Sequence, residues 1–281
     1  MSKRLITVGH SPDPDDAFMH YALAEERVDL RGLRFEHVLK DIQTLNVWAM
    51  EGRLEVTAIS VHAYPYVQDR YLLLPHGASM GSGYGPIVVT REPLGDDELR
   101  RTTVAVPGLL TTAFLALRLR LGDFPHVAMP FDEILPAVAR GDVEAGLLIH
   151  EGQLTYAGEG LAKSIDLGEW CHAETGLPLP LGANAVRRDL GPDVIHDVTE
   201  VLRESISYAL ANREQALAYA ARFGRGLDDE LNDRFVGMYV NELTEDYGED
   251  GRRAVRELLE RGEALGAFSS LDRPVAVEFA A

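Results

Sequence analysis

The sequence predicts an α/β protein built from two lobes, with a ligand cleft between the lobes and a helical C-terminal segment. Its 281 residues, of which 46% are hydrophobic, are enough for two cores of moderate size. Short apolar runs alternate with stretches of helical periodicity as far as residue 190, which is typical of α/β sheets. From about Asp193 onward only helical periodicity remains, so we expect the chain to end in a group of helices.

Nine apolar runs predict β-strands, because each is short and bounded by turn residues. They lie at residues 5–8, 33–38, 56–60, 71–74, 86–90, 103–107, 126–130, 145–149 and 181–186. Four stretches between them have the i, i+3, i+4 spacing of amphipathic helices, at residues 15–26, 41–52, 111–122 and 131–141. Strands and helices in this order form βαβ units, so we expect parallel sheets with helices on both faces.

The C-terminal third predicts four helices with no strand among them, at residues 193–211, 213–224, 228–243 and 249–266. Such helices need a sheet to cover. The α/β alternation restarts at the polar stretch EPLGDDELRR. We therefore expect a larger discontinuous lobe at 1–89 and 190–281 and a smaller lobe at 90–189, joined by chain crossings near Thr90 and Val186.

Two segments share one pattern, in which a helix ends at a glycine and a buried strand follows a few residues later. One segment contains Gly52 and the other Gly141. Helix–glycine–strand units are common in α/β proteins, so chance explains the similarity equally well. If the segments are equivalent, Ser60 and His150 lie at the carboxyl ends of equivalent strands and face each other across the cleft.

Composition and charge narrow the partners that this chain can bind. A formal charge of −18, from 27 basic and 45 acidic residues, disfavours nucleic acid and membrane surfaces. Cys171 is the only cysteine, which excludes an internal disulfide and a cysteine-based metal cluster. The nine histidines lack paired metal-ligand spacing, and the apolar run at residues 5–8 is too short for an export signal. We expect a cytoplasmic protein with a small-molecule ligand and no metal.

Ligands of open α/β sheets bind beyond the carboxyl ends of the strands. The loop HSPDPDD follows the first predicted strand, and His10 and Ser11 leave that strand first, so they are candidates to face a ligand. Two prolines stiffen the rest of the loop, where Asp15 is placed to cap a helix that begins near Asp16. We expect Asp15 and Asp16 to have this structural role.

A second loop, VPGLLTTAF, combines Gly108 with Thr111 and Thr112 where a helix begins. Hydroxyls and free backbone N–H groups then converge at the positive end of the helix, which suits a carboxylate. A single threonine is also an ordinary N-cap. Two successive threonines after a glycine favour a ligand site.

Two further strand ends present reactive groups, the hydroxyl of Ser60 and the imidazole of His150. Histidine, with an unperturbed pKa of about 6.5, is the commonest general base, so His150 is our preferred catalytic residue and His10 its rival. The adjacent Glu151 is a candidate to orient the His150 ring. Other motifs fail. GSGYGP precedes a strand and lacks a phosphate-loop lysine, HEGQL is not a zinc motif, and Ser60 lacks a G-x-S-x-G elbow.

Several stretches together resemble the 1,4-dihydroxy-6-naphthoate synthases of the futalosine pathway of menaquinone biosynthesis. They include SPDPDDAFMHYAL, LNVWAMEGRLEVTAIS, VAVPGLLTTA, GLLIHE and TGLPLPLG, in order over about residues 5–240. The sister chorismate dehydratases of the same pathway are similar more weakly. The resemblance implies a periplasmic-binding-protein type II-like fold used as an enzyme, a lyase that needs no cofactor.

The resemblance also implies roles for particular residues. His150 would be the general base, and the substrate would contact Ala58, Ile59, Ser60, Thr112 and Ala113. That substrate would be cyclic dehypoxanthine futalosine, a small carboxylate cleaved to 1,4-dihydroxy-6-naphthoate and a sugar-derived fragment.

Two positions depart from the family pattern. A lysine often stands where this chain has Ala58, and the first loop more often has the form S-P-x-P-N-D. Without the lysine, hydroxyls and helix-end N–H groups must hold the carboxylate. The alternatives are a chorismate dehydratase, or a non-catalytic solute-binding protein for a small carboxylate, because this fold is used mostly for capture.

Overall fold

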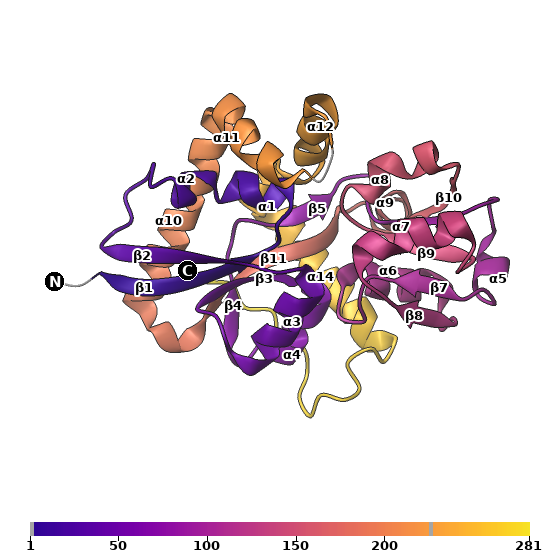
Figure 1. Ribbon diagram of the computed structural model, residues 1–281. Helices are drawn as coiled ribbons and strands as arrows, with labels where there is room; N and C mark the ends of the chain where they lie inside the picture. Colours follow the sequence, from indigo (N-terminus) through magenta and orange to yellow (C-terminus); the bar gives the residue numbers. More distant parts are fainter. Residues whose placement is uncertain (1–2, 225–226) are drawn as a thin grey trace.

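The computed structural model describes residues 3–224 and 227–281, which form two β-sheets lying side by side (Figure 1). The first sheet has the order β2-β1-β3-β11-β4, with β5 beside β11; its strands are β1 (Arg4–His10), β2 (Leu33–Leu39), β3 (Val56–Ser60), β4 (Tyr71–Leu73), β5 (Ser79–Gly81) and β11 (Leu179–Arg187). The second sheet has the order β10-β6-β9-β7-β8; its strands are β6 (Ile87–Thr90), β7 (Val104–Val106), β8 (His126–Ala128), β9 (Ala145–Leu148) and β10 (Ala162–Asp166).

Helices surround both sheets. Those of the first 190 residues are α1 (Pro14–Met19), α2 (Tyr21–Ala24), α3 (Ile42–Glu51), α4 (Tyr64–Val67), α5 (Asp96–Leu99), α6 (Thr112–Leu121), α7 (Phe131–Arg140), α8 (Gly152–Thr155) and α9 (Leu167–Thr175). The C-terminal helices are α10 (Pro192–Ala211), α11 (Arg213–Ala220), α12 (Asp229–Tyr239), α13 (Glu242–Glu245) and α14 (Gly248–Ala264). Short 3-10 turns complete the described chain at η1 (Val61–Ala63), η2 (Tyr156–Glu159), η3 (Arg188–Leu190) and η4 (Ala221–Phe223).

Both sheets are mixed, so the expectation of parallel sheets is wrong. In the first sheet, β1 is parallel to β2 and β3, whereas β11 is antiparallel to β3, β4 and β5. In the second sheet, β7 is parallel to β8 and β9, whereas β6 is antiparallel to β9 and β10. The chain enters the second sheet with β6 and returns to the first with β11, and each of these strands runs against its new neighbours.

The same two strands place the chain crossings earlier than expected. β6 begins at Ile87 and already belongs to the second sheet, while β11 begins at Leu179 and already belongs to the first. The expected crossings near Thr90 and Val186 therefore fall inside strands. An apolar run does not indicate which sheet it joins, which is why the boundaries at 89 and 190 are misplaced. The division into two lobes remains a prediction. In it, β6 now belongs to the smaller lobe and β11 to the larger one.

Two strands and the nine-residue helix α9 have no counterpart among the predicted elements, and neither do the short helices α4, α5 and α8 or the 3-10 turns η1, η2 and η3. In β5 only Met80 is apolar, and in β10 the apolar Ala162 and Ile165 are separated by Lys163 and Ser164, so neither strand contains an apolar run. The helix α9 begins where the Asp166 carboxylate accepts hydrogen bonds from the N–H groups of Gly168 and Glu169. Its cap residue at the other end, Gly176, is left-handed. An acidic N-cap and a C-terminal glycine are readable helix signals, so α9 could have been predicted from them.

Two stretches that were each predicted as one helix are divided into two helices. The stretch 15–26 is interrupted at His20, which separates α1 from α2. The stretch 228–243 ends at Tyr239, because Val240 is extended and the Asn241 side chain caps the next helix, α13. The helices predicted at 41–52 and 131–141 end as expected at Gly52 and Gly141, both left-handed.

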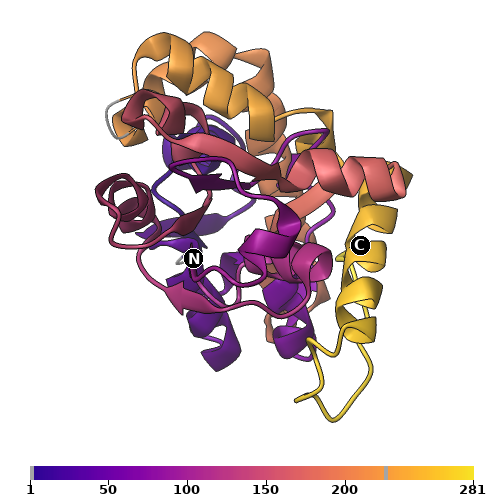
Figure 2. The ribbon, with the colours of Figure 1, turned by 90° about the vertical axis from the view of Figure 1, so that its right-hand side faces the viewer.

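The largest buried apolar cluster continues from one sheet to the other. It includes Leu73 and Ala183 of the first sheet, Leu115 of α6 and Val255 of α14. Figure 2 shows α14 along one side of the molecule, where it contacts both β11 and α6. Because burial of apolar surface is the main stabilising force in folding, this shared core holds the two sheets in contact.

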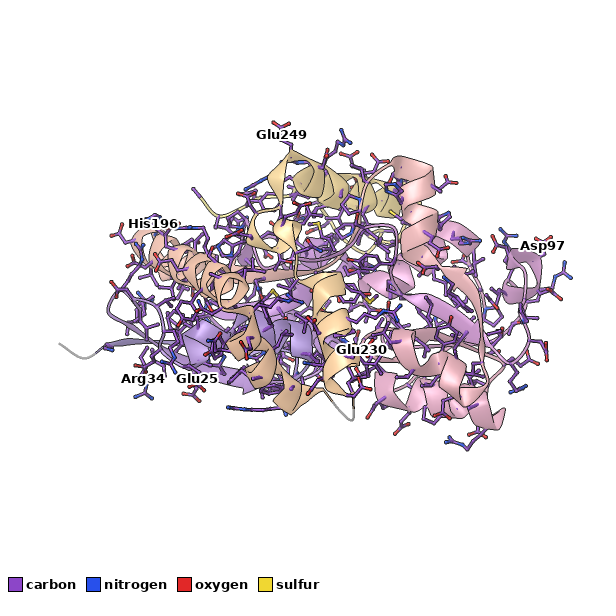
Figure 3. The ribbon with its side chains drawn as sticks, turned by 90° about the horizontal axis from the view of Figure 1, so that it is seen from above. Glu25, Arg34, Asp97, His196, Glu230 and Glu249 are labelled. Carbon is purple, nitrogen blue, oxygen red and sulfur yellow. The ribbon has the colours of Figure 1, made fainter. Side chains whose placement is uncertain are left out.

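Charged side chains cover the outside of the molecule. Glu25, Asp97, Glu230 and Glu249 project from separate elements (Figure 3). The described helices include none that is both long and apolar enough to cross a membrane.

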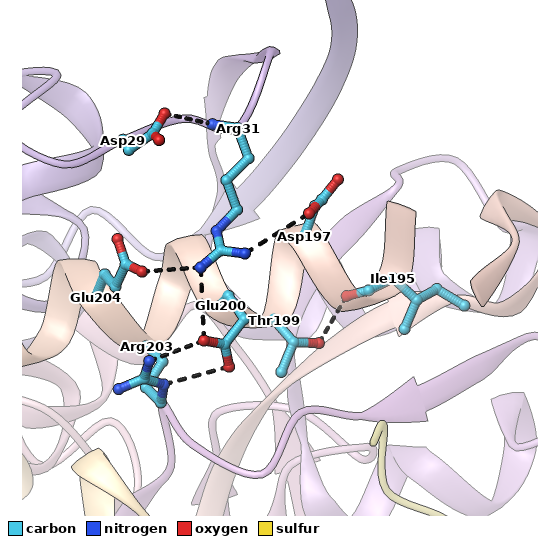
Figure 4. A network of polar contacts seen from close by, with 8 residues as sticks. All are labelled: Asp29, Arg31, Ile195, Asp197, Thr199, Glu200, Arg203 and Glu204. Carbon is cyan, nitrogen blue, oxygen red and sulfur yellow. Dashed lines mark hydrogen bonds and ion pairs between the residues drawn. The ribbon is translucent and has the colours of Figure 1, made fainter. Parts of the chain in front are cut away.

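One surface network connects the turn before β2 to the helix α10 (Figure 4). The guanidinium of Arg31, a residue with a left-handed φ of 49°, lies 3.1 Å from a carboxylate oxygen of Glu204 and 3.7 Å from one of Glu200. Asp197 completes the group at 3.8 Å. These contacts are solvent-exposed and lie away from the cavity described below, so we assign them a structural role.

Candidate active site

A cavity lies between the two sheets. It has about 720 Å³ of non-atom space, part of it open to solvent, which is within the usual size range of small-molecule sites. Its walls are the loop before α1 with the first turn of α1, the end of β3, the middle of β11, the start of α6, the segment after β9, and α12. Both sheets therefore contribute to one cleft, as expected for ligands that bind beyond strand ends.

Eight of the nine predicted site residues line this cavity. They are Ser11, Ala58, Ile59, Ser60, Thr111, Thr112, Ala113 and His150. Ser60 ends β3, and His150 follows β9 after Ile149, so the two repeated helix–glycine–strand segments do deliver their strand ends to one cleft. Their contacts with a substrate remain predictions.

His10 does not line the cavity, and its predicted placement there is wrong. β1 continues through His10, so Ser11 is the first residue to leave the strand. The His10 ring is 2% exposed, stacks on His20 at 4.3 Å between ring centroids, and has its Nε2 3.0 Å from Nδ1 of His37. Burial, followed by the charges of His20 and His37, lowers its pKa well below the ordinary value. These contacts remove His10 as a rival base.

His150 has an unusual backbone and a defined partner. Its φ of 58° is left-handed, a conformation that costs a non-glycine residue about 1–2 kcal/mol and that often marks functional sites. Its Nδ1 lies 3.2 Å from Oδ2 of Asp13, and its ring packs edge-on against Phe131. The other ring nitrogen, Nε2, is buried and has no hydrogen-bond partner among the described residues. Asp13 therefore fixes Nδ1 of the His150 ring, whereas Nε2 makes no hydrogen bond to the described residues.

The acidic loop before α1 differs from expectation. The helix begins at Pro14 with Asp13 as its N-cap residue, so Asp15 is not the cap. Asp15 instead accepts a hydrogen bond from the Ser79 hydroxyl at 3.3 Å, and Asp16 accepts one from the N–H of Ser11 at 2.7 Å. All three carboxylates line the cavity. A helix N-cap needs one acidic side chain, whereas residues 13–16 contain three. This excess was the sequence signal for an acidic cavity wall, and sequence reasoning missed it.

Burial changes the acidity of two aspartates in the first turn of α1. It raises the pKa of Asp15 to about 6, with the neighbouring Asp13 charge as the second cause, while His150 acts in the opposite direction. Burial and the Asp15 charge also raise the pKa of Asp16 well above its ordinary value. The carboxylate that contacts Nδ1 of His150 is that of Asp13, and an orienting role of Glu151 stays a prediction.

The opposite wall is formed by hydroxyls that the protein itself already uses. The Thr111 hydroxyl caps α6 by accepting from the N–H of Phe114, and it donates to the carbonyl of Gly108. The Thr112 hydroxyl accepts from the N–H of His62 at 3.2 Å and donates to the carbonyl of Leu181 at 2.6 Å. Each threonine hydroxyl therefore already donates its proton within the protein, and a contact of either hydroxyl with a ligand remains a prediction. The first N–H groups of α6, which have no partner within a helix, remain to face an anion.

Asn46 was missed by sequence reasoning although it organises this wall. Its side chain is fully buried and makes two bonds to Ser60, donating to the hydroxyl at 3.0 Å and accepting from the N–H at 2.8 Å. Because the Ser60 hydroxyl accepts from Asn46, its own O–H is free to donate toward the cavity. An asparagine inside an amphipathic helix gave no signal of this contact.

The charge of the cavity lining is one-sided. Among the described residues that line it are Asp13, Asp15, Asp16 and His150, and no lysine or arginine. Near His150, whose carbonyl accepts from the N–H of Gln153, the buried Tyr239 hydroxyl donates to Oε1 of Gln153 at 2.7 Å. No group of three or more histidine, cysteine or acidic side chains in the described ranges is arranged to hold a metal ion.

Two mixed sheets around a ligand-sized cavity define a binding-protein-like α/β protein. The fold is similar to that of the alkanesulfonate-binding protein SsuA of Xanthomonas axonopodis pv. citri, with a TM-score of 0.74 at 12% identity, covering 99% of this chain and 97% of that one. It is also similar to protein AF1704 of Archaeoglobus fulgidus, with a TM-score of 0.90 at 48% identity, covering 94% and 98% of the two chains.

The chain belongs to the menaquinone biosynthesis family, whose model matches residues 6–264. It is 46% identical over 272 residues to a 1,4-dihydroxy-6-naphthoate synthase of Thermus thermophilus, covering 97% of this chain and 99% of that protein. It is 41% identical over 277 residues to a second such synthase, from Streptomyces coelicolor, covering 96% and 97%.

Proposed function

We propose that this chain is a 1,4-dihydroxy-6-naphthoate synthase, a lyase that cleaves cyclic dehypoxanthine futalosine to the naphthoate and a sugar-derived fragment. Its family and its two synthase relatives support this assignment. The observation that carries it is the His150 ring at the cavity between the sheets, with Asp13 at its Nδ1. We also propose a cytoplasmic location, in line with the single free Cys171.

His150 is the general base of the proposed reaction. Cleavage of a bond next to a ring system begins with removal of a proton from a hydroxyl or an activated carbon. The Asp13 carboxylate accepts the Nδ1–H bond, which leaves Nε2 as the basic nitrogen and stabilises the imidazolium once the proton arrives. The imidazolium then returns this proton to the departing fragment, so no other proton source is required.

The substrate carboxylate binds at the opposite wall in this proposal. Ser60, Thr112 and Ala113 line this wall, so the hydroxyl of Ser60 and the N–H groups of Thr112 and Ala113 are its donors. The dipole of the ten-residue α6 favours a negative charge at the same place. Ala58 and Ile59 contribute strand backbone beside them. Thr111 supports the site as the N-cap of α6.

Turnover of purified protein tests this proposal. Incubation with cyclic dehypoxanthine futalosine should yield 1,4-dihydroxy-6-naphthoate, detected by chromatography and mass. A stable complex without naphthoate would instead assign the chain to solute capture, the use made of this fold by SsuA. Loss of water from chorismate, with the futalosine compound unchanged, would assign it to chorismate dehydratase. Either of these two results contradicts the proposal.

A further inference from the structure

The cavity has two chemically different ends, one on each side of β11. Gly182 pairs with Ser60 of β3 on one side and with Ser79 of β5 on the other. Neighbouring strands lie about 4.8 Å apart, so Ser60 and Ser79 are separated by roughly 10 Å across the floor of the cavity. All three residues line it.

The floor between these ends is bare. A Cβ at Gly182 would come no closer than 3.7 Å to its neighbours, and the Gly182 φ lies outside the left-handed region. Packing and backbone geometry therefore do not require glycine at this position. Its effect is to leave room for a ligand that spans both ends.

The Ser60 end offers donors without charge. The Ser60 hydroxyl accepts from Asn46 and can donate its own proton, and the N–H groups that begin α6 lie beside it. Donors at a helix N-terminus stabilise an anion.

The Ser79 end offers acceptors with negative charge. Asp15 and Asp13 are 8% and 1% exposed, and Asp15 already accepts from the Ser79 hydroxyl. A carboxylate accepts hydrogen bonds from hydroxyl groups and repels another carboxylate. His150 lies at this end, because its Nδ1 contacts Asp13.

We infer that the substrate binds in one orientation, with its aromatic carboxylate at the Ser60 end and its hydroxyl-bearing, sugar-derived carbons at the Ser79 end, where Asp15 is the specificity-determining residue. The inference rests on the function proposed above. It places the fragment that departs next to the base, because His150 and Asp15 share one end. It also explains how a cavity without lysine or arginine among its described lining residues can accept an anionic substrate.

Binding of two compounds to matched variants tests this orientation. The naphthoate lacks the sugar-derived part, whereas cyclic dehypoxanthine futalosine has both parts. Calorimetric titration on a His150→Asn background prevents turnover during the measurement. Asp15→Leu removes the carboxylate but keeps a side chain of similar size. It should weaken binding of the futalosine compound by about tenfold, which corresponds to the loss of one or two hydrogen bonds. Binding of the naphthoate should be unchanged or tighter. Asp15→Asn, which keeps an acceptor oxygen, should restore most of the loss.

Ser60→Ala is the matched control at the other end and should weaken both compounds by similar factors. Ser79→Ala and Gly182→Ala keep the test valid if Asp15→Leu does not fold. Ser79→Ala should weaken only the futalosine compound, and Gly182→Ala should weaken it more than the naphthoate by crowding the floor. An Asp15→Leu or Ser79→Ala variant that weakens both compounds equally would overturn the orientation. Failure of the proposed function is a separate result, namely no naphthoate from the wild-type protein.

Discussion

At the scale of single residues, the cleft depends on side chains whose partners lie on distant elements. Thr112 shows this most clearly, because one hydroxyl connects the N–H of His62 to the carbonyl of Leu181. Sequence reasoning found Thr112 from its place at a helix start, yet it could not find these partners. The same limit applies to Asp13, whose contact with His150 forms only when two separate sheets meet.

Thr112→Val should reduce stability more than it affects binding. The substitution leaves the Leu181 carbonyl and the His62 N–H without their partner, and a buried unsatisfied group costs about 1–3 kcal/mol. Urea denaturation should therefore give a lower free energy of unfolding, while KM changes little. Thr103→Val, at an exposed position, controls for the loss of a hydroxyl. A stable Thr112→Val variant with a much higher KM would show that this hydroxyl serves the substrate.

Buried histidines should weaken the fold in mild acid. Burial lowers the pKa of His20 to about 3 and those of His62 and His76 to about 4. The unfolded chain takes up protons below its ordinary histidine pKa of about 6.5 while the folded chain does not, so their contribution is complete above that pH and is lost as the pH falls toward 4. The contribution of each histidine to the free energy of unfolding falls by up to about 1.4 kcal/mol per pH unit.

The comparison must be made between variants, because Asp15 and Asp16 act in the opposite sense. Their raised pKa values make the folded state gain protons first, which increases stability as the pH falls. His20→Gln should therefore flatten the loss of unfolding free energy between about pH 6.5 and 4.5 relative to wild type. The exposed His196, visible in Figure 3, provides His196→Gln as the control. Equal slopes for wild type and His20→Gln would refute this account.

At the scale of elements, the sequence predicts well where local chemistry decides the structure. The helices before Gly52 and Gly141 were predicted to end at these glycines, and both glycines are left-handed. Most strands were predicted correctly from continuous apolar runs. Strand direction was not predictable, because a run such as Ile87–Thr90 has the same pattern in either orientation. Five of the eight lining residues were predicted from strand and helix ends, and the other three, Ala58, Ile59 and Ala113, only from the family resemblance. Asn46 and Asp13 were missed because their contacts depend on packing between elements.

The chain crossing into the second sheet depends on close backbone contact at Gly168. A Cβ there would overlap the backbone carbonyl group of Tyr84, so part of the crossing or of α9 must move. Gly168→Ala should lower the free energy of unfolding by about 1–3 kcal/mol, the usual cost of overpacking. Gly158→Ala is the matched control, because nothing lies within 4 Å of its added Cβ. Equal melting temperatures for the two variants would contradict this role of the crossing.

At the scale of the whole molecule, the net charge of −18 opposes the approach of an anionic substrate. The cavity adds three aspartates and, within the described lining, no lysine or arginine. Capture then depends on local N–H donors acting against the overall field. Salt screens that field over about 8–10 Å at physiological ionic strength.

We therefore predict that kcat/KM rises between low and physiological ionic strength. The measurement is the initial rate at low substrate concentration across a sodium chloride series, with a constant buffer. Steady-state rates at saturating substrate serve as the control, since encounter no longer limits them and they should stay nearly constant. A steep fall of kcat/KM with added salt would mean that a basic surface attracts the substrate.

The single-turnover rate of His150→Asn tests the central claim most directly. Enzyme in excess over cyclic dehypoxanthine futalosine isolates the chemical step from product release. If His150 is the base held by Asp13, the variant should fold and bind the naphthoate like wild type, while the rate of naphthoate formation falls by about 10²–10⁴, the usual contribution of a positioned general base. A His150→Asn variant that forms naphthoate at the wild-type rate would contradict the claim, because the proton would then be removed by another group.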